Sequence, residues 1–409
     1  MQIDNRKLLH WCIGLLCVVF QYSFNMVSSC FILDMANDFG IGHGAAGLIL
    51  SISLLCHGVL QIPAGSLIMK VGVRRFLVAS FFFFAVISFS VVNSSSIIVF
   101  LISRLLLGTF VSGFFVSYTT ITRQTMPIHI FGALLIFSET VIMVSEIFFN
   151  YSLVSFHILS WKNIMFGYGV SALIMAVVSF YGLKGDQFKA SKPNNLQLPI
   201  LRFLKTMGKD KELVGRSLLG GSLFLLMPII YGLWWPAFLS IGRNISLGEA
   251  ILQTQWMAVG IVIGNIYVSS LEPKKQNSNG LFILTNVVSI PLLFLMVLFP
   301  NQPLWSLDLM MLFLGFCCSV GMVAFTIVVS RDYPNELAIG FINGIMYFLM
   351  PFIQLWISIV MDSNFKISFF HAPMFDIQMG LLVCPLMQLI TLFISCYLIY
   401  QVKKEKMFI

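Results

Sequence analysis

The chain has 409 residues, of which 58% are hydrophobic and only 10% are charged, and its mean hydropathy is +0.94. Soluble domains carry about 25% charged residues, so this composition excludes a water-soluble globular protein and indicates one built from membrane-spanning segments. The net charge of +8 would suit a nucleic-acid-binding protein. The basic residues, however, lie between apolar segments, so they report membrane topology instead.

Twelve apolar stretches of about 20 residues, the length that a helix needs to cross a hydrocarbon core of about 30 Å, are predicted to span the membrane. In chain order they cover 8–32, 45–69, 76–93, 97–122, 131–156, 163–183, 217–241, 249–271, 280–299, 304–329, 338–361 and 376–400. The first span follows Arg6 and Lys7, but it is too long for a secretory signal and lacks a small-residue cleavage site. We therefore expect it to remain as a helix.

The distribution of Lys and Arg orients these spans, because short cytoplasmic loops collect positive charge. With a cytoplasmic N-terminus, the loops on that side hold most of the basic residues, and the other side has only Lys162, Arg243 and Lys366. An even number of crossings then places both termini in the cytoplasm. The sequence thus predicts a multi-pass protein of the cytoplasmic (inner) membrane.

The longest polar interval lies between the sixth and seventh spans and divides the chain almost in half. We expect an N-terminal six-helix bundle over 1–184, a cytoplasmic linker over 185–216 and a C-terminal six-helix bundle over 217–409, an all-α membrane fold typical of secondary transporters. A G-x-x-x-x-G-K-[ST] phosphate loop is absent, which disfavours an ATP-driven pump. We find no candidate nucleophile and no cofactor motif. The cysteines lack the paired spacing of a disulfide framework or a metal site. We therefore expect no enzyme, no cofactor and no metal.

The segment QIPAGSLIMKVGVRRF, residues 61–76, resembles the signature loop of the major facilitator superfamily, whose pattern is close to G-x-x-x-D-R-x-G-R-R. The residues that match in place are Gly65, Lys70, Gly72, Arg74 and Arg75. In the family this loop latches the two halves together on the cytoplasmic side, so the resemblance implies a cytoplasmic gating loop here. Met69 stands where the family usually has Asp, which implies a weaker or altered latch.

Further segments are similar to other motifs of the same family. RLLLGTFVSG (104–113) is similar to the fourth-span Arg-x-x-x-Gly pattern, and SWKNIMFGYGVSALIMAVVSF (160–180) resembles the Gly-Trp-Arg entry to the sixth span, with Lys162 in place of Arg. RDYPNELAIGFING (331–344) resembles the connection between the tenth and eleventh spans, and a degenerate loop lies near 272–275. The resemblance implies the major facilitator fold, and its style is similar to nutrient and metabolite transporters of intracellular proteobacteria.

Three charged side chains lie well inside predicted spans, away from their ends, where each costs at least a few kcal/mol and usually marks a pathway or a partner. Arg104 in the fourth span and Glu146 in the fifth lie at depths that differ by roughly 5 Å, so an ion pair between them is within reach. Such a pair would serve substrate anchoring or proton coupling, or it would only fix helix packing. Glu139 precedes Glu146 by two turns on the same face, and it either relays protons or reaches the cytoplasmic surface.

Polar residues at helical spacing form stripes on several spans. Ser53, His57 and Gln61 recur every four residues in the second span, where His57 either titrates or serves as a hydrogen-bonded packing residue. The other candidates are Gln21, Asn25 and Ser29 in the first span, Ser112 in the fourth, Tyr231 and Trp235 in the seventh, and Asn343, Tyr347 and Gln354 in the eleventh. Polar groups avoid lipid, so these residues should line helix contacts or a water-filled path, although Tyr231 and Trp235 also suit ordinary interface packing.

Together these features favour a monomeric secondary active transporter that takes up a small polar solute with protons by alternating access. Its expected partners are the solute, protons and the lipid bilayer, without nucleic acid. Glu146 or Glu139 would bind the coupling proton, and Arg104 would respond to that charge or hold an anionic substrate. The fifth span reads FSETVIMVSEIFFN and lacks the G-x-x-x-G-P-x-x-G-G stretch of proton antiporters, which favours uptake over the alternative of an exporter. A non-transporting membrane sensor would tolerate Met69 but leaves the buried charges unexplained.

Overall fold

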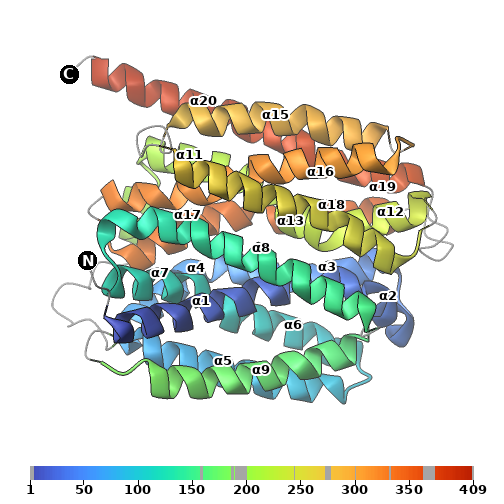
Figure 1. Ribbon diagram of the computed structural model, residues 1–409, viewed down its shortest axis with the longest axis horizontal. Helices are drawn as coiled ribbons and strands as arrows, with labels where there is room; N and C mark the ends of the chain where they lie inside the picture. Colours follow the sequence, from blue (N-terminus) through green and yellow to red (C-terminus); the bar gives the residue numbers. More distant parts are fainter. Residues whose placement is uncertain are drawn as a thin grey trace.

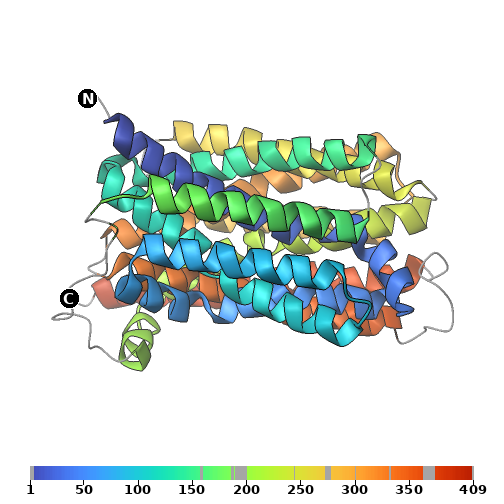
Figure 2. The same ribbon diagram turned by 90° about the horizontal axis from the view of Figure 1, so that it is seen from below.

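The structure, a computed structural model, describes residues 4–156, 160–185, 188, 200–243, 245–271, 278–299, 301–330, 333–362 and 374–407. These residues form helices and no strand. The long helices run roughly parallel to one another, and both ends of the chain lie at the same end of the bundle (Figures 1 and 2). We call this the terminal end and the other the opposite end.

The N-terminal half occupies the lower part of Figure 1, with α5 and α9 outermost. Its helices are α1 (Asn5–Met26), α2 (Ser28–Phe39), α3 (His43–Val59), α4 (Gln61–Val71), α5 (Val73–Val92), α6 (Ile97–Val111), α7 (Phe114–Thr125), the short η1 (Ile128–Ile130), α8 (Phe131–Ser155) and α9 (Trp161–Gly182). Gly72, with φ of 87°, separates α4 from α5, and only a glycine adopts this left-handed backbone without strain.

The C-terminal half occupies the upper part, with α15 and α20 outermost. Its helices are α11 (Lys211–Phe224), η4 (Met227–Trp234), α12 (Trp235–Arg243), α13 (Leu247–Ser270), α15 (Asn279–Leu298), α16 (Leu304–Cys318), η5 (Ser319–Ser330), α17 (Asn335–Phe348), α18 (Met350–Asp362), α19 (Met374–Leu381) and α20 (Val383–Met407). A short amphipathic helix, α10 (Ile200–Met207), lies within the predicted linker.

Among the described residues, eleven helical segments are long and apolar enough to cross a membrane, and the bent pair α3–α4 makes a twelfth if it is counted as one span. Large apolar side chains such as Phe148, Ile98 and Phe393 are about two-thirds exposed on the outside of the bundle. A surface of this kind suits lipid and not water. The prediction of an all-α membrane protein is confirmed.

Several spans are interrupted near their middle. The axis bends by 54° between α3 and α4 at Leu60, because Pro63 has no N–H to donate to the carbonyl of Val59 and its ring crowds the preceding turn. Other interruptions occur between α1 and α2, between α6 and α7, along the π-helical η4, at the start of the 3₁₀-helical η5, and between α17 and α18.

Some of these interruptions are paired between the halves, whereas the broken second and eleventh spans have the continuous helices α13 and α8 as their counterparts. The first and seventh spans occupy equivalent places in the two halves and are both broken, and so are the fourth and tenth. In transporters built from repeats, broken helices at equivalent positions surround the substrate site. The interrupted spans therefore indicate where a site should be sought.

The two halves pack along two seams. One seam joins α3 and α4 to α17 and α18, and the other joins α8 to α13. Small residues bring the backbones close, since a Cβ on Gly58 would lie 2.7 Å from Cβ of Tyr347 and a Cβ on Gly340 would lie 2.9 Å from the carbonyl oxygen of Gln61. The site described next lies along these seams.

Candidate functional site

Tyr22 on α1 and Tyr347 on α17 meet where the two halves touch. Their phenol groups interact with each other, and each ring also packs edge-on against Phe224 of α11, at centroid distances of 6.0 and 5.2 Å. Both tyrosines are almost completely buried. Tyr347 was predicted for the path, whereas Tyr22 was not, although it directly follows the predicted Gln21.

His57 on α3 lies beside Tyr347, with ring centroids 4.5 Å apart, and its Nε2 is 2.7 Å from Nε2 of Gln61 and 3.3 Å from Nε2 of Gln21. The orientation of the Gln21 amide is fixed, because the backbone N–H of Phe115 donates to its Oε1 at 2.9 Å. Gln21 must therefore donate through Nε2, so Nε2 of His57 accepts and the single ring proton sits on Nδ1. The structure thus assigns a neutral imidazole here.

The His57–Gln61 hydrogen bond also spans the bend at Leu60, because His57 lies in the last turn of α3 and Gln61 begins α4. It therefore closes the kink on the side that faces the other half. Among the described residues, Nδ1 of His57 and Oε1 of Gln61 have no hydrogen-bond partner. Two members of the predicted polar stripe of the second span, His57 and Gln61, are thus joined by a hydrogen bond across the helix bend.

Glu139 on α8 is fully buried and faces the C-terminal half. Its carboxyl group faces the amide of Asn265 on α13, and it acts electrostatically on Tyr22 and on Cys318 of α16. No described residue donates a hydrogen bond to either carboxyl oxygen, and the Asn265 amide is equally unsatisfied. The sequence left open whether Glu139 relays protons or reaches the cytoplasmic surface. Its buried position between the halves excludes the second alternative in this conformation.

Arg104 on α6 points into the N-terminal half. Its Nη2 donates at 3.0 Å both to the carbonyl oxygen of Leu50 and to Oγ of Ser53, and its guanidinium lies 4.7 Å above the Phe24 ring. Phe24 in turn packs against Phe84 of α5, which is on the outer side of this half. Arg104 therefore holds α1, α3 and α6 together, and its contacts lie within one half.

Glu146 on α8 is also buried within the N-terminal half, beside Ser23 of α1. The Ser23 hydroxyl is 2.7 Å from the hydroxyl of Tyr168 on α9, and Tyr168 interacts electrostatically with Arg104. The ion pair that the sequence placed within reach, Arg104 with Glu146, is not formed. Both carboxyl oxygens of Glu146 lack a hydrogen-bond partner among the described residues, because Arg104 is drawn toward α3 instead.

Asn25 and Gln354 line a small cavity between the halves, together with Ser51 and four apolar residues. About 10 Å³ of this cavity is open to the centre of a water molecule, roughly the space for a single water. Trp234 donates its indole N–H to Oε1 of Gln354 and so closes the cavity from the seventh span. In this conformation the path holds no space the size of a solute at this point.

Tyr231 on η4 connects the halves near the opposite end. Its hydroxyl accepts from Asn150 of α8 at 3.2 Å and donates to Gln255 of α13 at 2.8 Å. Trp235, predicted beside it, instead packs against Phe238 with ring centroids 4.7 Å apart. The wide π-helical turns of η4 change the register, so Trp234 and not Trp235 reaches Gln354.

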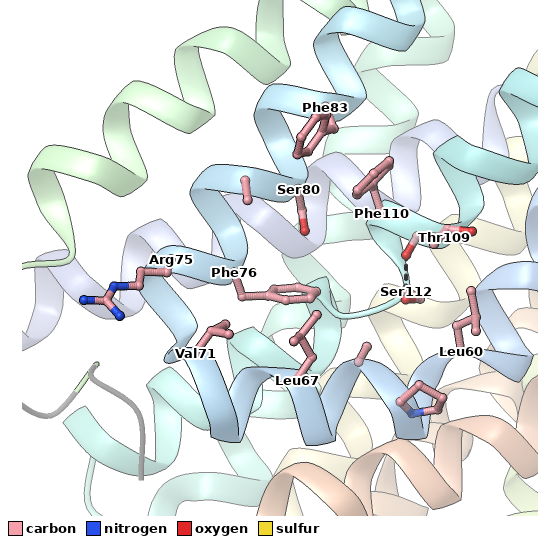
Figure 3. A pocket seen from close by; sticks show the side chains of 13 residues that line it. Leu60, Leu67, Val71, Arg75, Phe76, Ser80, Phe83, Thr109, Phe110 and Ser112 are labelled. Carbon is pink, nitrogen blue, oxygen red and sulfur yellow. Dashed lines mark hydrogen bonds between the residues drawn. The ribbon is translucent and has the colours of Figure 1, made fainter. Parts of the chain in front are cut away.

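Two other predicted path residues have different surroundings. Ser112 donates to the carbonyl of Thr109 at 2.7 Å and lines a groove on the outside of the N-terminal half, between α4, α5 and α6 (Figure 3). Asn343 is buried on α17, and its amide has no hydrogen-bond partner among the described residues. The side chain of Ser29, and residues 272–275 and 331–332, lie outside what the structure describes.

The predicted gating loop lies at the terminal end. Gly65 fits against α17 so closely that a Cβ there would be 2.6 Å from the carbonyl oxygen of Glu336. Arg74 donates twice to the carbonyl of Phe180, at 3.0 and 2.6 Å, and ties α5 to the end of α9. Lys70 and Arg75 are exposed, and Arg75 extends away from the groove of Figure 3.

Met69 stands where the family usually has Asp, and near it side chains of α7 contact the other half. Met69 is buried, while Thr120 donates to a carboxyl oxygen of Glu336 and Arg123 to Oδ1 of Asn335, each at 3.4 Å. Both acceptors lie in the first turn of α17. The sequence alone did not indicate these residues, although Glu336 lies in the segment that resembles the family's connection to the eleventh span.

At the opposite end, α2 is bound to the start of α9. Asp34 accepts from the backbone N–H of Trp161 at 2.9 Å, and Asp38 accepts from Lys162 at 2.8 Å and from the Trp161 indole at 3.0 Å. These interactions lower the pKa of Asp38, mainly through the bond from Lys162. Lys162 thus forms an ion pair with Asp38 at the entry to the sixth span.

No group of three or more His, Cys, Asp or Glu that could hold a metal ion occurs within the described ranges. The side chains described at the site supply carboxyl, amide, phenol and imidazole groups. These groups can bind a solute by hydrogen bonds and can hold or release protons.

Comparisons with known proteins bear on this arrangement. Residues 13–355 match the family model described as Major Facilitator Superfamily. The proton:xylose symporter XylE bound to 6-bromo-6-deoxy-D-glucose has a similar structure, with a TM-score of 0.69 at 15% identity over 96% of this chain and 95% of that one. A bacterial homologue of the human lysosomal transporter Spinster, inward-facing and occupied, has a TM-score of 0.66 at 13% identity over 95% and 96%. No curated protein sequence matches the chain.

Proposed function

Because the chain belongs to the Major Facilitator Superfamily, we propose that it carries a small polar solute along the seam between its halves by alternating access. One observation carries this proposal: buried polar groups from both halves converge along the seam, next to interrupted spans. Tyr22 and Glu139 contribute from one half, and Asn265 and Tyr347 from the other. Orphaned polar groups inside a membrane are costly, and a hydrogen-bonding solute would satisfy them.

The contacts at the two ends support an alternating mechanism. The terminal end is held by Thr120 and Arg123 against α17, and the opposite end by Asn150 against Tyr231. Each of these contacts is a single hydrogen bond between side chains, worth about 1 kcal/mol. Breaking one set while keeping the other opens the path to one side, as rocking of two halves requires.

We assign the coupling proton to Glu146. Its carboxyl group is buried beside Ser23, away from the seam, and no described residue neutralises it. A carboxylate in such surroundings is stabilised by a proton, so its charge state can follow the state of the bundle. Glu139 is the second carboxyl group that could serve, but its position between the halves suits contact with the solute better.

We further propose uptake across the cytoplasmic membrane, with both termini in the cytoplasm. The basic residues of the loops support this orientation, and the fifth span supports uptake because it lacks the antiporter pattern. An exporter is the alternative that the test below separates.

The test is transport by purified protein in proteoliposomes, across a panel of radiolabelled small solutes, with and without an imposed pH gradient. Accumulation of a solute on the acidic-outside gradient supports proton-coupled uptake. Accumulation driven by the opposite, acidic-inside gradient, in which protons leave as the solute enters, would assign a proton-coupled exporter. No movement of any solute under any gradient would overturn the proposal of transport.

A further inference from the structure

The seam between the halves is electrostatically one-sided. In the C-terminal half, the segments 250–271, 309–330 and 337–361 and the span residues 217–242 contain no Asp, Glu, Lys, Arg or His. Any charge that reaches a solute at mid-depth must therefore come from the N-terminal half. Its mid-span ionisable residues are His57, Arg104, Glu139 and Glu146.

Three of these four do not present a charge to the seam. Arg104 is held within the N-terminal half by Leu50, Ser53 and Phe24, and Glu146 lies beside Ser23 in the same half. His57 faces the seam, but its hydrogen bonds from Gln21 and Gln61 keep it neutral. Among the described residues, Glu139 is thus the charged group at mid-depth of the seam, whereas Arg123 and Glu336 lie at its terminal end.

We propose that Glu139 binds a protonated amino group of the transported solute. This inference rests on the proposed transport function and names its class of substrate. Both oxygens of Glu139 are buried and unpartnered, and the Asn265 amide opposite is also unpartnered. An ammonium group brings three donors and a positive charge, which match a carboxylate with an amide oxygen beside it.

The aromatic residues around the acid fit the same class of solute. Tyr22, Phe224 and Tyr347 form a contiguous aromatic cluster next to Glu139. Aromatic faces attract ammonium groups within about 6 Å of the ring centre, and they also pack well on the carbon skeleton of an amine. An anionic solute would meet a carboxyl group and no cation in this seam.

Glu139 is neutralised either by a proton or by the cationic solute, because an unpaired buried carboxylate is strongly unfavourable. Protons and amines should therefore compete for it. The other titratable groups that face Glu139 are Tyr22 of α1 and Cys318 of α16, with Asn265 of α13 as a neutral neighbour. Phenols and thiols titrate in a higher pH range than carboxyl groups, so Glu139 is the one of these mutually facing groups that responds below neutral pH. The same titration in Glu146→Gln separates its effect from that of the coupling carboxyl group.

The experiment measures binding to purified full-length protein by thermal stabilisation, using matched trios. Each trio contains an L-amino acid, the amine obtained by removing its carboxyl group, and the hydroxy acid obtained by replacing its amino group. We expect stabilisation by one or more amino acids or amines and by none of the hydroxy acids. In Glu139→Gln, binding of the effective solutes should weaken by at least about tenfold, because the buried charge pair is lost.

Asp308→Asn is the matched control, since it removes a half-buried acid of α16 whose carboxyl group faces Gln253 of α13, within the C-terminal half. It should bind as wild type does. If Glu139→Gln does not fold, the wild-type protein decides, because amine binding should weaken as the pH is lowered from about 8 to about 5. Hydroxy acids that bind as well as their amino partners, unaltered binding in a folded Glu139→Gln, or binding that does not weaken with acid would each overturn the assignment. A carrier that moves only solutes without amino groups would refute this class of substrate and leave transport intact.

Discussion

Tyr347 of the C-terminal half lies directly over Gly58 of the N-terminal half, in a contact where an added Cβ would come within 2.7 Å of Cβ of Tyr347. The same tyrosine faces His57 and Tyr22. A side chain at position 58 would therefore keep the halves apart at the level of the site, without disturbing the packing inside either half.

Gly58→Ala should consequently lower transport by at least about tenfold while the melting temperature changes little, because the steric conflict is relieved when the halves separate. Uptake and thermal unfolding of the purified variant check this. Gly167→Ala is the control, because a Cβ at Gly167 has no neighbour within 4 Å. Normal uptake by Gly58→Ala would show that this closed contact is not part of the transport cycle.

His57→Leu should destabilise the protein, because it leaves the amide donors of Gln21 and Gln61 without their shared acceptor. Each unsatisfied buried donor costs about 1–3 kcal/mol. His57→Gln offers an acceptor oxygen and should recover part of the loss in the melting temperature. Equal stability of the Leu variant and the wild type would contradict the tautomer that the Phe115–Gln21 hydrogen bond assigns.

The sequence predicted the spans well because crossing a membrane requires about 20 apolar residues, a signal that is local and strong. It also predicted which residues would be buried polar groups, since Gln21, His57, Glu139 and Gln354 interrupt apolar segments. The sequence did not show which neighbours these side chains would point toward. The 3.6-residue period places Glu139 and Glu146 on the same side of α8. Because α8 crosses α1 at an angle, Glu139 points toward the C-terminal half and Glu146 toward Ser23.

The partners of these residues were also out of reach of the sequence, because they depend on tertiary contacts between distant segments. Arg104 lies at a depth that permits a pair with Glu146, yet its guanidinium donates to the buried carbonyl of Leu50 and hydroxyl of Ser53. The register of η4 was equally hidden, since a π-helix is not signalled by composition. Tyr22 and Asn265 had a usable signal, as each is a polar residue within an apolar span.

The Asp38–Lys162 pair gives a pH dependence whose sign follows from the lowered pKa of Asp38. A carboxyl group with a pKa below its unfolded value of about 3.9 stabilises the folded state above that pH, and the contribution disappears as the pH falls through the folded pKa. Wild type should thus unfold at a higher temperature than Asp38→Asn at neutral pH, with the difference vanishing in acid. The difference should be small, since the side chains are 38% and 43% exposed. A gap that widens on acidification would contradict this account.

Glu146→Gln tests proton coupling separately from solute binding. The neutral amide keeps the shape of a protonated carboxyl group beside Ser23, so the protein should fold and the seam should bind solute as before. Without a group that exchanges protons, a pH gradient should no longer drive accumulation, whereas exchange of internal for external solute at equal pH should continue. Both are measured in the same proteoliposomes, with Asp308→Asn as the charge-neutralised control. Gradient-driven accumulation that persists in Glu146→Gln would move the coupling proton elsewhere, and loss of exchange together with accumulation would show that Glu146 is needed for the movement of the halves itself.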